Sequence, residues 1–520
     1  MAKIQVNDLT FSYESTFDPI FEHVSFTIDT SWKLGFIGRN GKGKTTFLNL
    51  LLGKYEYSGS ISCDVPCDYF PYKISDGDLD KTADELMEQW KPGVESWRVM
   101  CEISDLSVDA ELLYRPIRTL SFGEKTKVML AVLFAGENDF LLIDEPTNHL
   151  DKEAREIVKS YLAKKKGFIL VSHDRDLLDA CVDHVLVLNR STIEVQNGNF
   201  SSWWENKERA DAFARAENEK HMKEIGRLKS SMQKSQRWAT KSENTKIGFD
   251  PIKEHDRSKN TRGYIGAKTK KMESRVKVFE QRMERSIEEK EGLLNDVEQI
   301  RDLRLSPMTH FRDRLVETRD LSLQYKDSEK PVFEGLTFEI RNGERVFLQG
   351  KNGCGKTSLI KAILRDAGYR NDSAETDDSR APEDLSFTTE GTLLTAPHLQ
   401  ISYINQDTSH LHGDLRMHAF ENGVDYSLFL AVLRQLALEQ AQFEKNIEDF
   451  SEGQKKKVLI ATSLLQPAHL YIWDEPLNYV DVFSRMQLEK LISEYQPTML
   501  IVEHDVRFRE KMATKVVELN

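Results

Sequence analysis

Two short segments of the chain share the same spacing of glycine, lysine and threonine. Residues 38–45 read GRNGKGKT and residues 350–357 read GKNGCGKT, so both follow the pattern G-x-x-x-x-G-K-T. Backbone N–H groups of such a loop can surround phosphates, its lysine can reach the β- and γ-phosphates, and its threonine hydroxyl can bind Mg²⁺. The residues expected to hold a nucleotide in this way are Gly38, Asn40, Gly41, Gly43, Lys44, Thr45, Thr46, Gly350, Asn352, Gly353, Gly355, Lys356, Thr357 and Ser358.

Each of these segments is followed later in the chain by an apolar run that ends in Asp-Glu. The first run, FLLID, ends at Asp144, and the second, HLYIWD, ends at Asp474. A carboxylate at the end of an apolar strand is placed to hold a metal ion through water. The next residues, Glu145 and Glu475, are suited to polarise an attacking water, so we expect them to be catalytic.

Two further pairs of residues recur in both halves of the chain. His173 and His504 close the next apolar run in each half and are expected to contact a γ-phosphate; a cap at the strand end is the alternative. Tyr13 and Tyr325 are expected to lie on the first strand of each half and to stack on adenine. Ordinary strand aromatics are the alternative interpretation for this pair.

The paired motifs occur in the same order twice, so the chain contains an internal repeat. Each copy opens with period-2 alternation, and its later apolar runs alternate with helical patterns. This arrangement predicts an α/β fold with a buried, mostly parallel sheet. We expect one nucleotide-binding domain over residues 1–201 and a second over residues 303–520.

The segment between the two copies, residues 202–302, has a different pattern. Apolar residues keep helical 3/4 spacing from Ile225 to Met232 and again from Met272 to Ile287. This predicts an antiparallel helical hairpin with a coiled-coil seam, whose tip, about 241–263, breaks the periodicity.

Positive charge is concentrated on this hairpin. Residues 221–275 contain 15 Lys or Arg and 6 Asp or Glu, although the whole chain has a net charge of −13. A basic segment on an acidic protein favours one local surface for a polyanion such as RNA. A solvated hairpin whose lysines keep it soluble is the alternative.

Composition and the distribution of apolar residues indicate in which cellular compartment the protein is expected. No uninterrupted apolar run approaches the ~18–20 residues that span a bilayer, and MAKIQVNDLTFSY lacks the basic and apolar regions of a secretory signal. The five cysteines are few and scattered, which suits a reducing compartment. We therefore expect a cytoplasmic protein without a membrane partner.

Two further segments carry a family resemblance. LSFGE (120–124) and FSEGQ (450–454) precede the Asp-Glu pairs and resemble the signature loop of ATP-binding-cassette ATPases. The resemblance implies two cassettes of the P-loop NTPase type that hydrolyse ATP to ADP and phosphate with Mg²⁺. It also implies a monomer whose cassettes pair head to tail, so that Ser451 and Gly453 complete the first site and Ser121 and Gly123 the second.

One motif of that family is present in only one copy. The family's loop glutamine, which senses the γ-phosphate and contributes to metal coordination, matches Gln406 in SYINQ. The corresponding stretch of the first copy, DYFPYK, has Tyr72 instead. The two sites are therefore expected to differ in coordination and to hydrolyse at unequal rates.

Twin cassettes joined by a helical hairpin, with EPTNHLD and EPLNYVD after the catalytic strands, resemble the ABC-F translation factors. Only residues 46–67 separate Thr45 from Asp68, which leaves no room for the helical arm that housekeeping members often carry there. Together with the long tip and the lack of a basic tail after Val517, this resembles the antibiotic-resistance branch.

Membership of that branch implies binding to the tRNA exit site of the bacterial ribosome and protection against lincosamides, pleuromutilins and streptogramin A. It implies contacts of the hairpin with large-subunit rRNA and P-site tRNA. For the tip we expect Lys246, Ile247, Phe249 and Ile252 to lie nearest the drug-site RNA or the tRNA; anchoring of the loop against the coiled coil is the alternative. The competing functions are a housekeeping ABC-F factor, an ATPase subunit of a transporter and a DNA-repair ATPase; DNA is not an expected partner.

Overall fold

The structure is a computed structural model that describes residues 2–13, 19–136, 139–148, 150–189, 192–244, 305, 307–326, 328, 330–369, 387–436, 438 and 440–519. It divides into two compact units, one made of Met1–Trp203 with Arg301–Asn520 and the other of Trp204–Ile300. The expected tip residues Lys246, Ile247, Phe249 and Ile252, and the expected returning helix at 272–287, lie outside the described residues.

The first copy begins with an antiparallel sheet in the order β2-β1-β4. Its strands are β1 (Lys3–Phe11), β2 (Phe21–Asp29) and β4 (Ser58–Cys63). Ile4 and Val6 are buried while their neighbours on β1 are exposed, which explains the period-2 alternation of the sequence.

The second sheet of the first copy has the order β5-β6-β7-β3-β8-β9. Its strands are β3 (Lys33–Gly38), β5 (Cys67–Phe70), β6 (Phe140–Asp144), β7 (Phe168–Val171), β8 (His184–Leu188) and β9 (Ile193–Asn197). All neighbours are parallel except β8 and β9. The helices are α1 (Lys44–Leu51), α2 (Ala83–Trp90), α3 (Ser96–Asp105), α4 (Phe122–Phe134), α5 (Lys152–Lys164) and α6 (Arg175–Cys181).

The second copy repeats this design with an antiparallel sheet, β11-β10-β13, and a parallel sheet, β14-β15-β16-β12-β17. The strands are β10 (Arg314–Tyr325), β11 (Phe333–Arg341), β12 (Arg345–Gln349), β13 (Phe387–Thr395), β14 (Ile401–Ile404), β15 (Leu470–Asp474), β16 (Met499–Val502) and β17 (Lys515–Glu518). The helices are α9 (Lys356–Asp366), α10 (Leu415–Glu421), α11 (Tyr426–Gln435), α12 (Glu452–Leu465), α13 (Val482–Tyr495) and α14 (Val506–Met512).

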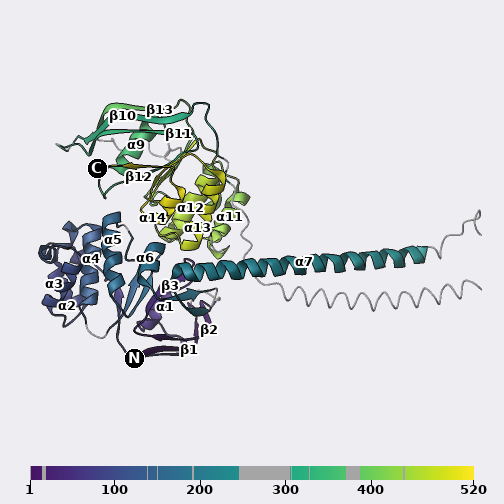
Figure 1. Cartoon of the computed structure of the whole chain (residues 1–520), viewed down its shortest axis with the longest axis horizontal. Helices are drawn as coiled ribbons and strands as arrows, with labels where there is room; N and C mark the ends of the chain where they lie inside the picture. The colour runs from purple at the N-terminus through teal and green to yellow at the C-terminus, as the bar shows by residue number, and fades with distance from the viewer. Residues whose placement is uncertain are drawn as a thin grey trace, which may run out of the picture. The chain divides into compact units, whose positions relative to one another are not determined.

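Helix α9 packs between the two sheets of the second copy, as Figure 1 shows. Ile360 and Ile363 of α9 share one buried cluster with Leu321 of β10 and Leu348 of β12. The opposite face of the parallel sheet is covered by the other helices, and Trp473 and Phe508 belong to that second cluster. The predicted α/β fold with mostly parallel sheets is therefore confirmed.

Strand order brings the three motif groups of each copy to one edge. In the first copy β7 lies between β6 and β3, and in the second β16 lies between β15 and β12. The glycine-rich loop, the Asp-Glu pair and the histidine each follow one of these three neighbouring strands. Because the carboxyl ends of parallel strands meet at the same edge, the three groups converge there.

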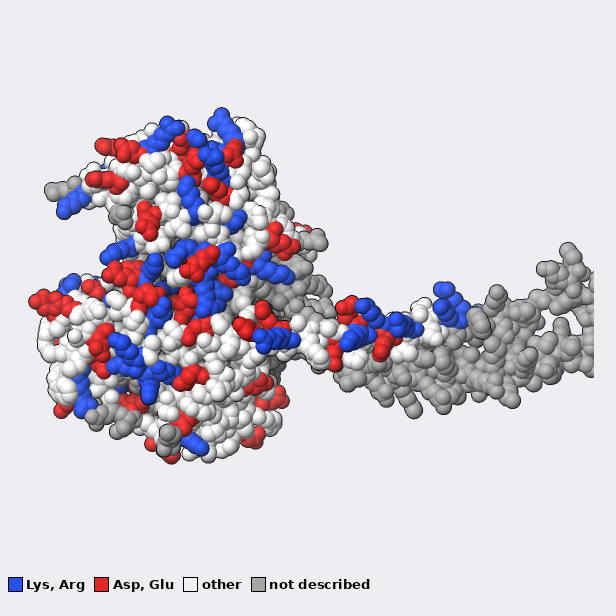
Figure 2. All heavy atoms as spheres, in the orientation of Figure 1, with Lys and Arg blue, Asp and Glu red and all other residues white. Residues whose placement is uncertain are grey.

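The linker opens with α7 (Phe200–Asn244), a single helix that continues three residues past position 241, where the tip was expected to begin. Ile225 is buried and Leu228 is half-buried, whereas their neighbours Glu224 and Lys229 are exposed. Figure 2 shows side chains of both charges along the described part of this helix. Among the described residues, no helix is long and apolar enough to cross a membrane.

Candidate functional site: two nucleotide sites

Both glycine-rich loops require glycine at the residue before their helix. Gly43 and Gly355 cap α1 and α9 in left-handed conformations, with φ of 104° and 95°. A Cβ at Gly43 would lie 2.4 Å from Ile20, and one at Gly355 would lie 2.5 Å from Val332. The backbone therefore turns tightly and leaves its N–H groups facing outward at the helix N-terminus, where an anion is stabilised.

The lysine of each loop folds over the loop itself. Lys44 Nζ donates to the Gly38 carbonyl at 2.8 Å, and Lys356 Nζ donates to the Gly350 carbonyl at the same distance. Burial lowers the pKa of Lys44, while nearby carboxylates, Asp481 first, oppose that shift. Both lysines are thus held beside the loop, where a phosphate would replace weak carbonyl contacts by charged ones.

The threonine of each loop reaches the carboxylate at the end of the neighbouring strand. Thr45 Oγ1 donates to Asp144 Oδ2 at 2.9 Å, and Thr357 Oγ1 donates to Asp474 Oδ2 at 2.9 Å. Asp474 Oδ1 is buried and accepts no hydrogen bond among the described residues, and burial raises the pKa of Asp474 to about 6. A hydroxyl beside an unsatisfied carboxylate oxygen is a donor set that fits Mg²⁺.

The glutamates after these aspartates have an unusual backbone conformation. Glu145 has φ of 50° and Glu475 has φ of 47°, in the left-handed region that side chains other than glycine rarely adopt. Burial, with Asp144 as the second cause, raises the pKa of Glu145 to about 8. Strain at both equivalent positions is typical of functional sites.

The two histidines lie beside these glutamates. His173 Nε2 is 3.3 Å from Glu145 Oε1, and His504 Nε2 is 3.7 Å from Glu475 Oε1. Burial holds the pKa of His173 well below its usual value, so this ring is neutral at physiological pH. His504 Nε2 is buried and makes no hydrogen bond among the described residues, which leaves it able to contact a phosphate oxygen.

The tyrosines expected to stack on adenine have polar partners in this structure. Tyr13 lies beyond the end of β1, contrary to the expectation that it lies on the strand, whereas Tyr325 ends β10. The Tyr13 hydroxyl lies 2.9 Å from Thr46 Oγ1, and the Tyr325 hydroxyl lies 2.6 Å from Ser358 Oγ. Both rings are therefore tied to the first turn of the helix that follows the glycine-rich loop.

The signature segments form helix caps that sequence reasoning missed. Ser121 caps α4 in a reciprocal box with Glu124, and Ser451 caps α12 in the same way with Gln454. The S-x-x-E/Q spacing of both segments was a visible signal for this cap. It leaves a helix N-terminus with outward-facing N–H groups at each signature serine.

The first glycine-rich loop is in contact with the second copy. Asn40 Nδ2 donates to the Tyr479 carbonyl, and a Cβ at Gly453 would lie 3.3 Å from Asn40 Nδ2. By contrast, a Cβ at Gly123 would meet only Leu150 and Ala154 of its own copy among the described residues within 4 Å. The structure therefore brings one signature glycine to the opposite loop and not the other.

Ion pairs between the two copies add contacts that no sequence pattern signalled. Arg175 is ion-paired with Glu489 of the second copy, and both side chains are buried. Arg507 of the second copy pairs with Asp176 of the first. Such pairs depend on which helix faces which, so periodicity and motif spacing carry no information about them.

The loop residue that follows β14 in the second copy, Gln406, and the one that follows β5 in the first copy, Tyr72, have different partners, as expected. Gln406 Nε2 donates to Glu475 Oε2 at 2.8 Å, so this residue, expected among the metal ligands, contacts the glutamate rather than Asp474. Asn478 Nδ2 donates to the same oxygen at 2.7 Å. In the first copy, the Tyr72 hydroxyl donates instead to Asp68 Oδ2 at 2.8 Å.

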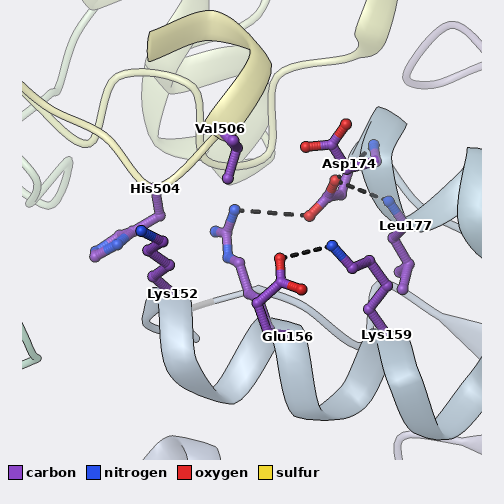
Figure 3. Close-up of a pocket in the computed structure, with 9 residues that line it drawn as sticks. Lys152, Glu156, Lys159, Asp174, Leu177, His504 and Val506 are labelled. Carbon is purple, nitrogen blue, oxygen red and sulfur yellow. Dashed lines mark hydrogen bonds and ion pairs between the residues drawn. The ribbon is translucent and has the colours of Figure 1, made fainter. Parts of the chain in front are cut away.

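A pocket lies beside His504, between α5 and the residues before α14. It is lined by Lys152, Arg155, Glu156, Lys159, Asp174, Asp176, Leu177, His504 and Val506, most of which Figure 3 labels. Two of its cations are paired within it, Arg155 with Asp174 at 3.8 Å and Lys159 with Glu156 at 2.6 Å. The pocket is therefore not a strongly cationic cavity.

Each copy contains one P-loop site and one signature helix. Together these define an ATPase of the cassette type. The sequence model of the ABC transporter family matches residues 21–148 and 333–478, which is more than half of the chain. The chain therefore belongs to the ABC transporter family, and it is an ATP-binding ATPase.

Related proteins match almost the whole chain in sequence. The ribosome protection protein VmlR of Bacillus subtilis is 27% identical over 96% of this chain and 84% of its own length. The ATP-binding protein Uup of Caulobacter vibrioides is 24% identical over 96% of this chain and 75% of its own length. The match to VmlR confirms the resemblance to the ribosomal-protection branch, and ATP hydrolysis by the chain follows from the family.

Solved structures share the tandem arrangement. The archaeal ribosome recycling factor aABCE1, in a complex with the stalk protein aP1, covers 98% of this chain and 87% of its own with a TM-score of 0.60 and 18% identity. The structure titled RNase-L Inhibitor gives a TM-score of 0.58 with 16% identity over 98% of this chain and 87% of its own. These likenesses concern the fold alone.

Proposed function

We propose that this chain is an ATP-dependent ribosome-binding factor that protects the bacterial ribosome against antibiotics of the peptidyl-transferase centre. A monomer with two paired cassettes enters at the tRNA exit site, and its linker contacts large-subunit rRNA and P-site tRNA. The observation that carries the proposal is the match to a ribosome protection protein over 96% of the chain, a span that includes the linker.

In this proposal each cassette edge binds one ATP. Lys44 and Lys356 hold the β- and γ-phosphates, while the glycine-loop N–H groups and the signature helix N-termini orient the triphosphate. Thr45 with Asp144, and Thr357 with Asp474, hold Mg²⁺, which neutralises phosphate charge when it is bound.

The glutamates and histidines then act on the γ-phosphate. Glu145 and Glu475 orient the attacking water and accept its proton, and His173 and His504 donate from Nε2 to the γ-phosphate. ATP binding closes the cassettes on the ribosome, and hydrolysis lets them separate and release it. Asn40 of the first loop donates to the Tyr479 carbonyl, which lies beside Gly453 of the second copy, and this is the contact that closure would tighten.

The linker is the part that acts on the drug site. Lys246, Ile247, Phe249 and Ile252 are proposed to lie nearest the drug-binding RNA or the tRNA. Shape and phosphate contacts from a basic tip suit structured RNA, where most recognition depends on backbone geometry.

Growth inhibition tests the proposal directly. A sensitive bacterium that expresses the chain should tolerate lincosamides, pleuromutilins and streptogramin A at raised concentration, with no change for an aminoglycoside. Phe249→Ala with Ile252→Ala should abolish the protection. The matched control is Phe213→Ala, which removes an exposed aromatic side chain near the start of the same linker and should leave protection intact.

A second experiment separates ribosome binding from drug protection. Glu145→Gln combined with Glu475→Gln should keep the chain on ribosomes in ATP, as measured by co-sedimentation, because closure persists without hydrolysis. Free dissociation of this double variant in ATP would contradict the proposed cycle. Ribosome binding without any protection would favour the alternative, a housekeeping ABC-F factor acting at the same site.

A further inference from the structure

In the second copy, Gln406 after β14 contacts the catalytic glutamate, Glu475. The loop after β5 in the first copy has no glutamine at this position. Phe70 pairs with Ile143 in the first parallel sheet, as Ile404 pairs with Trp473 in the second. Tyr72, two residues after Phe70, is therefore the structural counterpart of Gln406. Its ring stacks on Trp90 of α2, with centroids 5.3 Å apart and planes inclined by 4°, so it is directed to α2 and not to Glu145.

A different tyrosine of the same strand reaches the first site. Tyr69 donates its hydroxyl hydrogen to Asp144 Oδ2 at 3.1 Å, the same oxygen that accepts from Thr45 at 2.9 Å. Two hydroxyl donors on one oxygen fix the orientation of the carboxylate and direct Oδ1 away from them. This is an arrangement that orients a metal-binding carboxylate.

The equivalent tyrosine of the second copy has another partner. Tyr403 occupies the position in β14 that Tyr69 occupies in β5, one residue before the end of the strand. Its hydroxyl points to Asn405 Oδ1 at 3.5 Å, while Asp474 Oδ2 accepts from Thr357. The residue type is therefore the same in both copies, and the hydrogen bond to the aspartate is specific to the first.

A buried network holds β5 in the position that this contact needs. Asp68 accepts from Tyr72 and from Lys91 Nζ, the latter at 2.8 Å. Lys91 also pairs with Asp139 at 2.7 Å and donates to the Leu133 carbonyl at 2.7 Å. These contacts tie the strand before Tyr69 to the ends of α2 and α4. In the second copy, the residue paired in the same register is Ser402, which contacts Ser463 instead.

We propose that Tyr69 is a positioning residue of the first ATP site, whose hydroxyl holds the Asp144 carboxylate in the orientation that Mg²⁺ binding needs. The inference rests on the proposed role of Asp144 in that site. Its consequence is that the two sites depend on different residues to orient the aspartate that binds the metal.

The test measures nucleotide affinity one site at a time in the full chain. With Lys356→Ala to disable the second site, binding of a fluorescent ATP analogue is titrated in Mg²⁺ and in EDTA. Tyr69→Phe keeps the ring and removes only the hydroxyl, and it should weaken binding about tenfold in Mg²⁺, since a hydrogen bond to a charged group is lost. Binding in EDTA should change less than about twofold, because phosphate contacts remain.

The matched control is Tyr403→Phe with Lys44→Ala, which should change the Mg²⁺-dependent affinity of the second site less than about twofold. Equal loss with Mg²⁺ and with EDTA, or no loss, would overturn the proposal. A metal titration at fixed nucleotide gives the same answer as a shift in the Mg²⁺ midpoint, and thermal unfolding checks that Tyr69→Phe folds. Neither readout involves ribosomes, so failure here is distinguishable from failure of the proposed function.

Discussion

The two nucleotide sites of this chain use the same loop, threonine and Asp-Glu pair, but they hold their carboxylates differently. In the second site, Gln406 and Asn478 both donate to Glu475, whereas Asp474 keeps an unsatisfied oxygen. In the first site, Tyr69 donates to Asp144, and Glu145 has the His173 side chain nearby. The second copy therefore directs two side-chain amides to its glutamate, and the first directs two hydroxyls to its aspartate, which teaches that a shared motif set does not imply equivalent sites.

The largest expected difference between the copies is in stability. Lys457 Nζ donates to Asp481 Oδ2 at 2.8 Å, with both side chains buried, whereas the counterpart Lys127 is only half-buried. Lys457→Ala leaves the Asp481 carboxylate buried without its cation and should cost about 3 to 5 kcal/mol. Thermal and denaturant unfolding measure this cost.

Lys127→Ala is the matched control and should cost less than about 1 kcal/mol. Equal destabilisation by both variants would mean that the copies use this position in the same way.

The next largest difference concerns catalysis. Glu475→Gln should lower steady-state ATP hydrolysis about a hundredfold, because it removes the glutamate that two side-chain amides orient. Glu145→Gln should lower it less than about tenfold, since no side-chain amide donates to this glutamate among the described contacts, and the His173 backbone N–H donates to it only at 3.4 Å. Phosphate release under saturating MgATP measures both.

An equal loss in the two single variants would show that the sites are coupled in an obligatory way. Single-turnover measurements with either glycine-loop lysine replaced then separate coupling from intrinsic rate.

A third prediction addresses the loop residue itself. Gln406→Ala should lower hydrolysis about tenfold, because Glu475 loses one of its two amide donors. Tyr72→Phe should change hydrolysis less than about twofold, since the Tyr72 hydroxyl is directed to Asp68 and not to the site. A large effect of Tyr72→Phe would show that the Asp68 network controls the first site.

The smallest expected effect is a pH dependence confined to the second copy. His418 is buried and bonded to Thr462, and burial, then His410 and His412, lower its pKa to about 4. Because an unfolded histidine titrates near 6.5, this contribution is complete above that pH and is lost as the pH falls toward 4. At pH 5.5 the loss is about 1 kcal/mol.

The same helical position in the first copy is the buried Leu86. His418→Leu with Thr462→Val should therefore reduce the fall in unfolding temperature of the second cassette between pH 7 and pH 5.5. An unchanged pH dependence in this double variant would exclude His418 as its source.

Much of the fold and of each site was predictable from local patterns. Glycine-rich loops, apolar runs ending in Asp-Glu and the order of the motifs predicted an α/β repeat with converging sites, because parallel strands place their carboxyl ends at one edge. The cap formed by Ser121 and Glu124 was also readable, from its S-x-x-E spacing.

The hydrogen-bond partners of individual side chains could not be predicted from local sequence patterns. That Tyr13 stacks on adenine and that Gln406 binds the metal remain predictions. The hydrogen bond of Tyr13 with Thr46 and that of Gln406 with Glu475 had no signal in the sequence. Both outcomes depend on rotamers set by packing, which a spacing pattern does not encode. The domain limits 1–201, 202–302 and 303–520, and the roles of the tip residues, remain predictions.

The sequence by itself determined the chemistry that each copy can perform. Fixed short-range geometry links a glycine-rich turn to phosphate binding and a strand-end carboxylate to a metal, so residue type and spacing suffice for those assignments. Only the tertiary structure decided that Arg175 meets Glu489, and that the hydroxyl of Tyr69, not that of Tyr72, donates to Asp144. These contacts join elements far apart in the chain, and their existence depends on packing that no local pattern specifies.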